Sequence, residues 1–394
     1  MDAIVTISGG GIIGNYISSR LNNLNIKCVV VEKNQEVFSS ESNIRTLTLN
    51  PISKKLLDDV GIEVPSAVIK EISVFDAEGT GKIVFDASEI NHDNLSYVVF
   101  FDDLLKALQE SEHSKIIFDN EIVSINEDTN DEFCEVLLKS KDVINTTFVA
   151  GCDGRNSNVA KITGQKSKRS DYNQTAITFT TISENIDEGR AFQIFSERGI
   201  FAAMPLPKNN HGATHTIVWS INNSKLKDQT SIEEYVSKNI HYFEKKLNTK
   251  YKICSDLISF KLSNHYFENY ISSSTVLIGD AAHSIHPLAG QGINLGFADA
   301  DVFCEEIINS YNKTRKINKN ITLKRYEIRR KKMNLLMLKS MDFFVELFKS
   351  QNLLLILLRN IGLSGVNKIK FLKTFFINHA AGNNKLESIS TPKF

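Results

Sequence analysis

The chain has 394 residues, which is long enough for two joined domains or for one large α/β domain with an insertion. Its 46 basic and 46 acidic residues cancel, which argues against a protein that binds nucleic acid through bulk positive charge. Five cysteines without a Cys-x-x-Cys pair indicate free thiols in a reducing compartment, and the sequence contains neither a signal-peptide pattern nor a membrane-spanning apolar run. We therefore expect a cytoplasmic protein.

The N-terminal residues predict a β-α-β unit. Residues 4–7 are typical of a strand, residues 15–24 of a helix and residues 28–31 of a second strand that ends before Glu32. Between the first strand and the helix stands the run Gly9-Gly10-Gly11-Ile12-Ile13-Gly14. A unit of this length implies that the two strands are parallel.

The pattern changes further along the chain. Helices are expected over residues 52–60 and 102–109, a hairpin over 72–85, and strands over 115–126, 135–145 and 148–152. Alternating apolar and polar residues between 175 and 221 then predict an antiparallel sheet, and a buried strand returns at 275–278. Helices are predicted over 293–311 and through 323–376.

These elements predict an α/β fold. We expect a Rossmann-like dinucleotide-binding domain, an inserted and mostly antiparallel β-sheet substrate domain, and a helical C-terminal region. The predicted boundaries are 1–72, 98–165 and 265–330 for the first domain, 73–97 and 166–264 for the second, and 331–394 for the C-terminal region.

The glycine run has the spacing G-x-G-x-x-G of a dinucleotide-binding turn. Gly9 permits the tight turn, Gly11 lets the backbone approach a diphosphate, and Gly14 lets the helix pack closely on the strand. The diphosphate would lie at the helix N-terminus, where unpaired N–H groups favour an anion. Glu32, at the end of the second strand, is placed to accept hydrogen bonds from ribose hydroxyls. This pattern does not distinguish FAD from NAD.

Two later motifs follow buried strands. Asp153-Gly154 by itself is most often a structural turn. In the second motif, Asp280 could hold a polyol hydroxyl, and the backbone of Gly290 and Gly292 could approach a flat ring. The helix that follows would direct its positive end at that ring.

Other readings of these residues remain open. His283 and His286 flank Asp280, yet residues crowded into one turn rarely reach a common ion, so no metal is expected. Residues 324–373 contain twelve basic and three acidic residues. This basic region is either a solvated helical layer with oligomer contacts or a surface for an anionic membrane or partner.

The motifs together resemble the group A flavoprotein aromatic monooxygenases, and in particular the hydroxylases of ubiquinone biosynthesis. The Gly9–Gly14 run, Asp153-Gly154 and Gly279-Asp280 occur in that family's order and approximate spacing. The strings that resemble the ubiquinone branch are residues 45–49, 204–206, 286–296 and 359–363.

The resemblance implies that the Rossmann-like domain is an FAD-binding domain of the glutathione-reductase type, and it implies roles for individual residues. Gly9, Gly11, Gly14 and Glu32 would bind the ADP half of FAD, and Arg45 would lie near the flavin or the diphosphate. Asp153 and Gly154 would touch the diphosphate and help NAD(P)H to dock. Asp280 would hold ribityl or phosphate groups. The flavin ring would meet Gly290, Gly292, Ile293 and Asn294, with Pro287 lining its reactive face. No catalytic acid or base is assigned.

The implied reaction hydroxylates the aromatic ring of a polyprenylated phenol, using NAD(P)H, O2 and a flavin hydroperoxide. Hydroxylation of a soluble phenol, prenyl reduction, and a non-catalytic assembly partner remain alternatives. Phe100-Phe101 keeps the last of these open, because the family usually has polar residues there. Ser8 and Ile194 also depart from the pattern.

Overall fold

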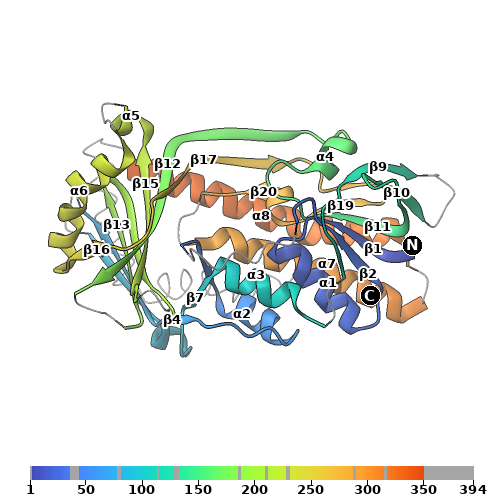
Figure 1. Ribbon diagram of the computed structural model, residues 1–394, viewed down its shortest axis with the longest axis horizontal. Coiled ribbons are helices and arrows are strands. Elements are labelled where there is room, and N and C mark those ends of the chain that lie inside the picture. Colours follow the sequence, from blue (N-terminus) through green and yellow to red (C-terminus); the bar gives the residue numbers. More distant parts are fainter. Residues whose placement is uncertain are drawn as a thin grey trace.

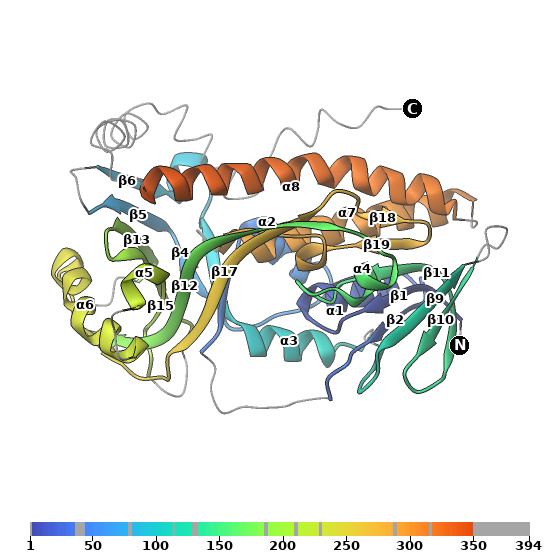
Figure 2. The same cartoon turned by 90° about the horizontal axis from the view of Figure 1, so that it is seen from above.

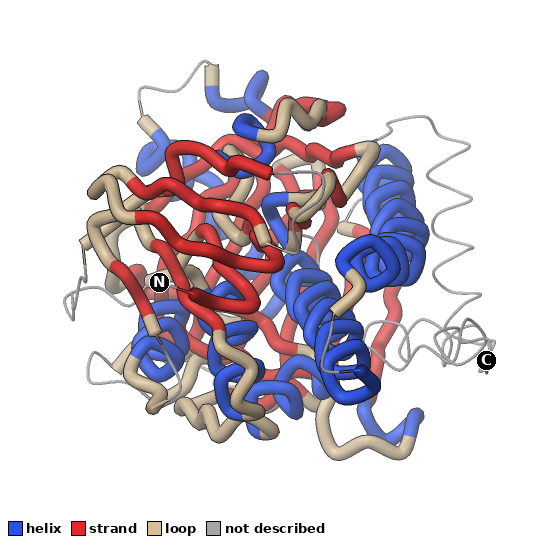
Figure 3. The backbone as a smooth tube through the Cα atoms, turned by 90° about the vertical axis from the view of Figure 1, so that its right-hand side faces the viewer, coloured by secondary structure: helices blue, strands red, loops and turns tan. Residues whose placement is uncertain are grey.

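The computed structural model describes residues 2–35, 44–77, 81–112, 115–127, 133–184, 188–208, 212–227, 231–286, 290–314 and 317–349. These residues form three β-sheets with helices around them (Figure 1). The sheet that contains the N-terminal strand lies at one end of the long axis, and a larger sheet lies at the other end. Viewed from the N-terminal end, the strands of the first sheet lie beside a group of helices (Figure 3).

The first sheet is built around the predicted β-α-β unit. β1 (Asp2–Ser8) lies between β2 (Cys28–Val31) and β11 (Val143–Gly151), and both neighbours run parallel to it. The residues that follow these strands therefore meet at one edge of the sheet, where the strand order reverses and α/β folds bind ligands. The remaining strands are β8 (Ile116–Ile117), β9 (Ile122–Glu127), β10 (Cys134–Leu138), β18 (Ile271–Ser272) and β19 (Thr275–Leu277).

Helices cover this sheet and bury its apolar residues. α1 (Ile12–Asn23) packs on α7 (Gln291–Thr314), with the rings of Tyr16 and Phe297 edge to face at 5.3 Å. Such burial explains why β2 consists only of buried apolar residues, as expected of a parallel strand covered on both faces. The other helices near this sheet are α3 (Phe101–Gln109) and α4 (Asn158–Ile162).

The second sheet contains nine strands and is antiparallel except for one pair, β13 with β5. Two of its strands, β12 (Ser167–Ser183) and β17 (Ile258–Phe267), form a long ribbon that reaches back toward the first sheet (Figure 1). The aromatic core of the sheet includes Trp219 and Phe201 and is closed by α6 (Ile232–Leu247). The other elements are β5 (Glu71–Asp76), β6 (Lys82–Asp86), β13 (Arg190–Ser196), β14 (Gly199–Pro205), β15 (His215–Asn222), α5 (Asn223–Leu226), β16 (Tyr251–Ile253) and β20 (His283–Ser284).

A third, three-stranded sheet lies between the two larger ones. It has the order β3 (Thr46–Leu49), β7 (Ser96–Phe100) and β4 (Ala67–Ile69). A hydrogen bond of 3.3 Å between the hydroxyls of Thr46 and Thr216 joins it to the second sheet. The short elements nearby are α2 (Pro51–Asp58) and the 3-10 helices η1 (Ala87–Ile90) and η2 (Gly279–Ala281).

α8 (Lys319–Lys349) runs along the molecule from the first sheet to the second (Figure 2). The Tyr326 hydroxyl donates to the carbonyl oxygen of Leu277 in β19, and the Tyr172 hydroxyl of β12 donates to Asp342. α8 is therefore hydrogen-bonded to both the first and the second sheet. No helix in the described part of the chain is long and apolar enough to cross a membrane.

Several predicted boundaries differ from the structure. The predicted strand over 135–145 is wrong, because a turn with Lys141 at φ +73° separates β10 from β11. The predicted strand over 115–126 is likewise two strands, β8 and β9. The predicted domain boundary at 264/265 falls inside β17, and the boundary at 330/331 falls inside α8. The domain division remains a prediction, and residues 350–376 of the predicted last helix lie outside the described residues.

Candidate functional site

The glycine turn after β1 shows why glycine stands at two of its positions. Gly9 has φ +106°, and a Cβ on it would lie 2.6 Å from the carbonyl oxygen of Cys152. A Cβ on Gly14 would lie 2.1 Å from the carbonyl oxygen of Gly9. Gly11 is different, because no atom lies within 4 Å of the position its Cβ would take. Gly9 and Gly14 therefore allow the turn and its packing, whereas Gly11 faces open space.

The N-terminus of α1 can accept an anion. Gly11 is its N-cap, no described side chain caps it, and its first turn contains no acidic residue. The Asn15 amide instead donates to the carbonyl oxygen of Gly10 at 2.6 Å and so fixes the turn. The unpaired N–H groups and the helix dipole favour a negative group in the space beside Gly11.

Glu32 lies beside the same turn, directly after β2. One oxygen of its carboxylate accepts from the backbone N–H of Gly10 at 2.6 Å, and the other accepts from the N–H of Asn34 at 2.9 Å. These bonds hold the carboxylate at the edge where β1 and β2 end, and its side chain is only partly buried. The predicted ribose contact is therefore compatible with the position of Glu32.

Asp153 has a structural task that the sequence did not predict. Its Oδ2 accepts from the N–H groups of Asn158 at 2.7 Å and Val159 at 3.1 Å, and from the Ser8 hydroxyl at 3.2 Å. It thereby fixes the start of α4 and joins the ends of β11 and β1. Its Oδ1 is buried without a hydrogen-bond partner among the described residues, which suits a position beside a ligand. Gly154 follows with φ +74°.

The Gly279-Asp280 turn follows β19 at the same edge. Gly279 has φ +61° and packs against Gly296, where a Cβ on Gly279 would lie 3.5 Å from the Gly296 Cα. The Asp280 side chain reaches the protein surface, but desolvation by the surrounding protein raises the pKa of its carboxyl. The buried ring of His265 donates from Nε2 to the carbonyl oxygen of Asp280 at 2.9 Å. Burial, followed by the Arg155 charge, lowers the pKa of His265 to about 4.

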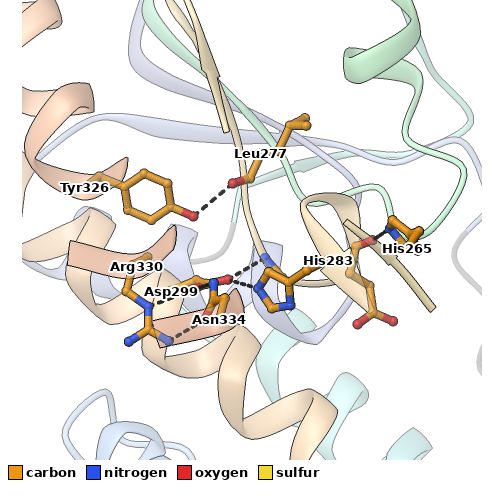
Figure 4. Close-up of polar contacts among 9 residues, drawn as sticks. His265, Leu277, His283, Asp299, Tyr326, Arg330 and Asn334 are labelled. Carbon is orange, nitrogen blue, oxygen red and sulfur yellow. Dashed lines mark hydrogen bonds and ion pairs between the residues drawn. The ribbon is translucent and has the colours of Figure 1, made fainter. Parts of the chain in front are cut away.

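A buried ionic cluster beneath this turn was missed at the sequence level (Figure 4). Asp299 of α7 accepts from the backbone N–H of Gly279 at 3.1 Å, from His283 at 2.6 Å and from the Arg330 guanidinium of α8 at 2.7 Å. Asn334 adds a bond of 2.8 Å to the same carboxylate. Burial opposes ionisation of Asp299, but the charges of His283 and Arg330 outweigh it and hold the pKa of Asp299 below its usual value. The spacing of Arg330 and Asn334 on one helical face was the available sequence signal.

The start of α7 lies against the third sheet. Gly290 has φ +63°, and a Cβ on it would lie 2.8 Å from the Cβ of Thr48. Gly292 has no atom within 4 Å of its Cβ position, and Ile293 follows it, partly exposed. The contact of Asn294 with the cofactor remains a prediction, and its side chain is hydrogen-bonded to the protein. Its Oδ1 accepts from the N–H of Asn50 at 2.9 Å, and its Nδ2 donates to the carbonyl oxygen of Thr48 at 2.9 Å.

Arg45 directly precedes β3, and its guanidinium carbon lies 4.0 Å from the centre of the Phe101 ring. Phe100 is buried in the core between the third and second sheets. The two phenylalanines therefore support Arg45 and fill the core, which gives a structural reason for residues that depart from the family pattern. Ile194 is fully buried in the second-sheet core. Pro287, predicted to line the flavin face, lies outside the described residues.

His283 and His286, the two histidines near Asp280, form hydrogen bonds with different residues. His283 binds Asp299, whereas the His286 ring pairs with the Gln174 side chain at 2.9 Å and lies edge-on to Tyr172. Burial lowers the pKa of His286 to about 4. Within the described residues, no group of three or more His, Cys, Asp or Glu side chains is arranged to hold a metal ion.

The turns after β1, β2, β11 and β19 thus form one edge with an open glycine, an uncapped helix and three carboxylates. The sequence profile of the FAD binding domain family matches residues 2–339. The chain belongs to the FAD binding domain family. The predictions of an FAD-binding family and of a mixed α/β fold are thereby confirmed.

Relatives and solved structures agree with this assignment. The chain is 27% identical to 3-demethoxyubiquinol 3-hydroxylase of Escherichia coli, over 96% of this chain and 98% of the relative. It is 25% identical to ubiquinone hydroxylase UbiL of Rhodospirillum rubrum, over 98% of this chain and 90% of the relative. Its fold is similar to p-nitrophenol 4-monooxygenase PnpA of Pseudomonas putida, with a TM-score of 0.77 and 17% identity over 98% of this chain and 100% of that one. The fold is also similar to HpxO of Klebsiella pneumoniae, solved with FAD, with a TM-score of 0.76 and 15% identity over 98% of this chain and 100% of that one.

The residues present fit the family's cofactor. The open space at Gly11 and the uncapped α1 suit a diphosphate, and the unpartnered Oδ1 of Asp153 suits a neighbouring donor. Glu32 and Asp280 offer carboxylate oxygens to ribose and ribityl hydroxyls. The individual contacts remain predictions.

Proposed function

We propose that this protein hydroxylates the aromatic ring of a polyprenylated phenol or quinone precursor in ubiquinone biosynthesis, using FAD, NAD(P)H and O2. The observation that supports this most strongly is similarity over nearly the whole chain to two relatives named as ubiquinone hydroxylases. The similarity extends through the second sheet and α8, which lie outside the glycine turn.

Different residues of the chain would bind different parts of FAD. When bound, FAD supplies hydride acceptance and oxygen activation. The N–H groups at the start of α1 would hold its diphosphate, and Glu32 would accept from ribose hydroxyls. The Asp299 cluster would fix the Gly279-Asp280 turn, so that Asp280 meets the cofactor without rearranging. The N-terminus of α7 would stabilise negative charge near the ring.

The surroundings of α7 support a substrate site between the ring and the second sheet. Gly290 touches Thr48 of β3, and the Thr48 hydroxyl lies 3.4 Å from the sulfur of Met204 in β14. Three segments distant in sequence thus meet where the flavin ring is expected. A substrate at this junction would be shielded from water by the second sheet, which protects reactive intermediates from side reactions.

The decisive experiment is the mass profile of quinones and their precursors in cells that lack this gene. We expect a prenylated precursor that lacks one ring hydroxyl to accumulate, and its structure would identify the position hydroxylated. Expression of the intact gene should remove the precursor. An unchanged profile in a strain without another hydroxylase would contradict the proposal and favour a soluble phenol or a non-catalytic role.

We also propose that α8 lies on an anionic membrane surface. Ile321, Ile328, Leu336 and Phe343 are each more than half exposed and recur every seven or eight residues along it. Exposed lysines at 324, 332 and 339 lie among them. Apolar and basic residues together favour an anionic lipid surface. Full-length protein should sediment with anionic vesicles, and an Ile328→Glu, Leu336→Glu variant should stay in the supernatant; equal sedimentation of both proteins would refute this.

A further inference from the structure

His286 has a buried ring nitrogen without a hydrogen-bond partner. The residue follows β20 and stands in the chain between the Asp280 turn and the start of α7, the two segments expected to meet the flavin. Its side chain is 1% exposed, and its Nε2 lies 2.9 Å from Oε1 of Gln174 in β12. Its Nδ1 is buried and has no partner among the described residues. A buried polar atom of this kind costs free energy unless a ligand or a water molecule satisfies it.

The protonation state of the His286 ring decides which ligand group Nδ1 can bind. Because Oε1 of Gln174 can only accept a hydrogen bond, Nε2 of His286 carries the proton, and Nδ1 carries a lone pair in the neutral ring. Burial lowers the pKa of His286 to about 4, so the ring is neutral at pH 7. Nδ1 is therefore a hydrogen-bond acceptor, and the ligand group that matches it is a donor such as a hydroxyl.

The second sheet and α8 hold this ring in one orientation. Gln174 and Tyr172 both reach His286 from β12, at a bulge where the register with β17 shifts and Asn173 has φ +54°. Bulges redirect side chains and are frequent next to active sites. The Tyr172 ring lies edge-on to His286 at 4.9 Å, and the Tyr172 hydroxyl donates to Asp342 of α8 at 2.5 Å. The position of Nδ1 is therefore fixed before a ligand binds, as a binding residue requires.

We propose that Nδ1 of His286 accepts a hydrogen bond from the ring hydroxyl of a phenolic substrate and so sets which ring carbon faces the flavin. This inference rests on the proposed hydroxylase function. Tyr172, beside His286, packs against the apolar side chains of Phe195 and Val345, and a hydrogen bond is stronger in apolar surroundings than in water. The histidine acts as an acceptor and not as a base, because a phenol with a pKa of about 10 does not transfer its proton to a ring that titrates near 4.

Binding of two probes to FAD-saturated, oxidised protein tests this proposal without turnover. The probes are 2-prenylphenol and its methyl ether, which keeps the ring and the prenyl group but lacks the donor hydroxyl. The change in flavin absorbance on titration gives the affinity of each probe. We expect the phenol to bind about tenfold more tightly than the ether, because the ether leaves Nδ1 of His286 without a partner. This comparison on the unmodified protein needs no variant to fold.

Two variants of the same residue assign the preference to Nδ1. His286→Gln can keep the bond to Gln174 but has no polar atom at the Nδ1 position, so the phenol should lose its advantage over the ether. His286→Asn places an amide oxygen near the Nδ1 position and should keep most of that advantage. Equal binding of the two probes to the unmodified protein, or an unchanged preference in His286→Gln, overturns the inference and leaves the hydroxylase proposal standing. If neither probe binds, the inference falls together with the proposed polyprenylated substrate.

Discussion

Replacing Asp299 by asparagine is expected to lower the free energy of unfolding by about 3–5 kcal/mol, because the change leaves the Arg330 guanidinium buried without its anion. Asparagine keeps the shape of the side chain, so the loss reports on charge and not on a cavity. Chemical denaturation followed by circular dichroism measures it. Glu305→Gln is the matched control, since it breaks the partly exposed pair with Arg329 and should cost no more than about 1 kcal/mol.

The same variant should have a distinct pH dependence. The pKa of Asp299 is lowered in the folded protein, so its stabilisation is present above the unfolded pKa of about 3.9 and is lost as pH falls through the lower folded value. The unmodified protein should therefore lose stability at acid pH more steeply than Asp299→Asn. Parallel pH profiles, or a loss no larger than that of Glu305→Gln, would show that the cluster does not stabilise the turn.

Valine at Gly11 is expected to weaken FAD binding by about a hundredfold or more while leaving the fold intact. Gly11 has φ −75° and ψ −175°, which valine adopts readily, and no atom lies within 4 Å of its Cβ position. The added side chain would occupy the space beside the α1 N–H groups, where two or three charge-assisted bonds to a diphosphate are expected. Titration of deflavinated protein with FAD, followed by flavin fluorescence, gives the affinity.

Gly14→Ala provides the contrast, because its Cβ would lie 2.1 Å from the carbonyl oxygen of Gly9. This variant should lower the melting temperature of the apoprotein, whereas Gly11→Val should change its stability by no more than about 1 kcal/mol. If both variants destabilise the apoprotein equally, Gly11 is a packing residue. If Gly11→Val binds FAD normally, the diphosphate lies elsewhere.

The departures from the family pattern illustrate how far sequence reasoning reaches. Phe100 and Phe101 raised the alternative of a non-catalytic protein, but the structure places one in a core and the other under Arg45. Asn294 was predicted to meet the cofactor, which remains a prediction, and its side chain also joins α7 to β3 and α2. A motif residue and a structural residue look alike in sequence, because the partner that distinguishes them is far away in the chain.

The sequence by itself determined the β-α-β unit, the glycine turn with Glu32, the later antiparallel sheet and the family. These follow from local spacing, since periodicity and glycine positions depend on neighbours in the chain. Only the tertiary structure decided that Asp299, His283 and Arg330 form one cluster and that β17 and α8 cross the predicted boundaries. In this cluster His283 and Asp299 are 16 positions apart and Asp299 and Arg330 are 31 positions apart, so only the packing of the folded chain brings them together.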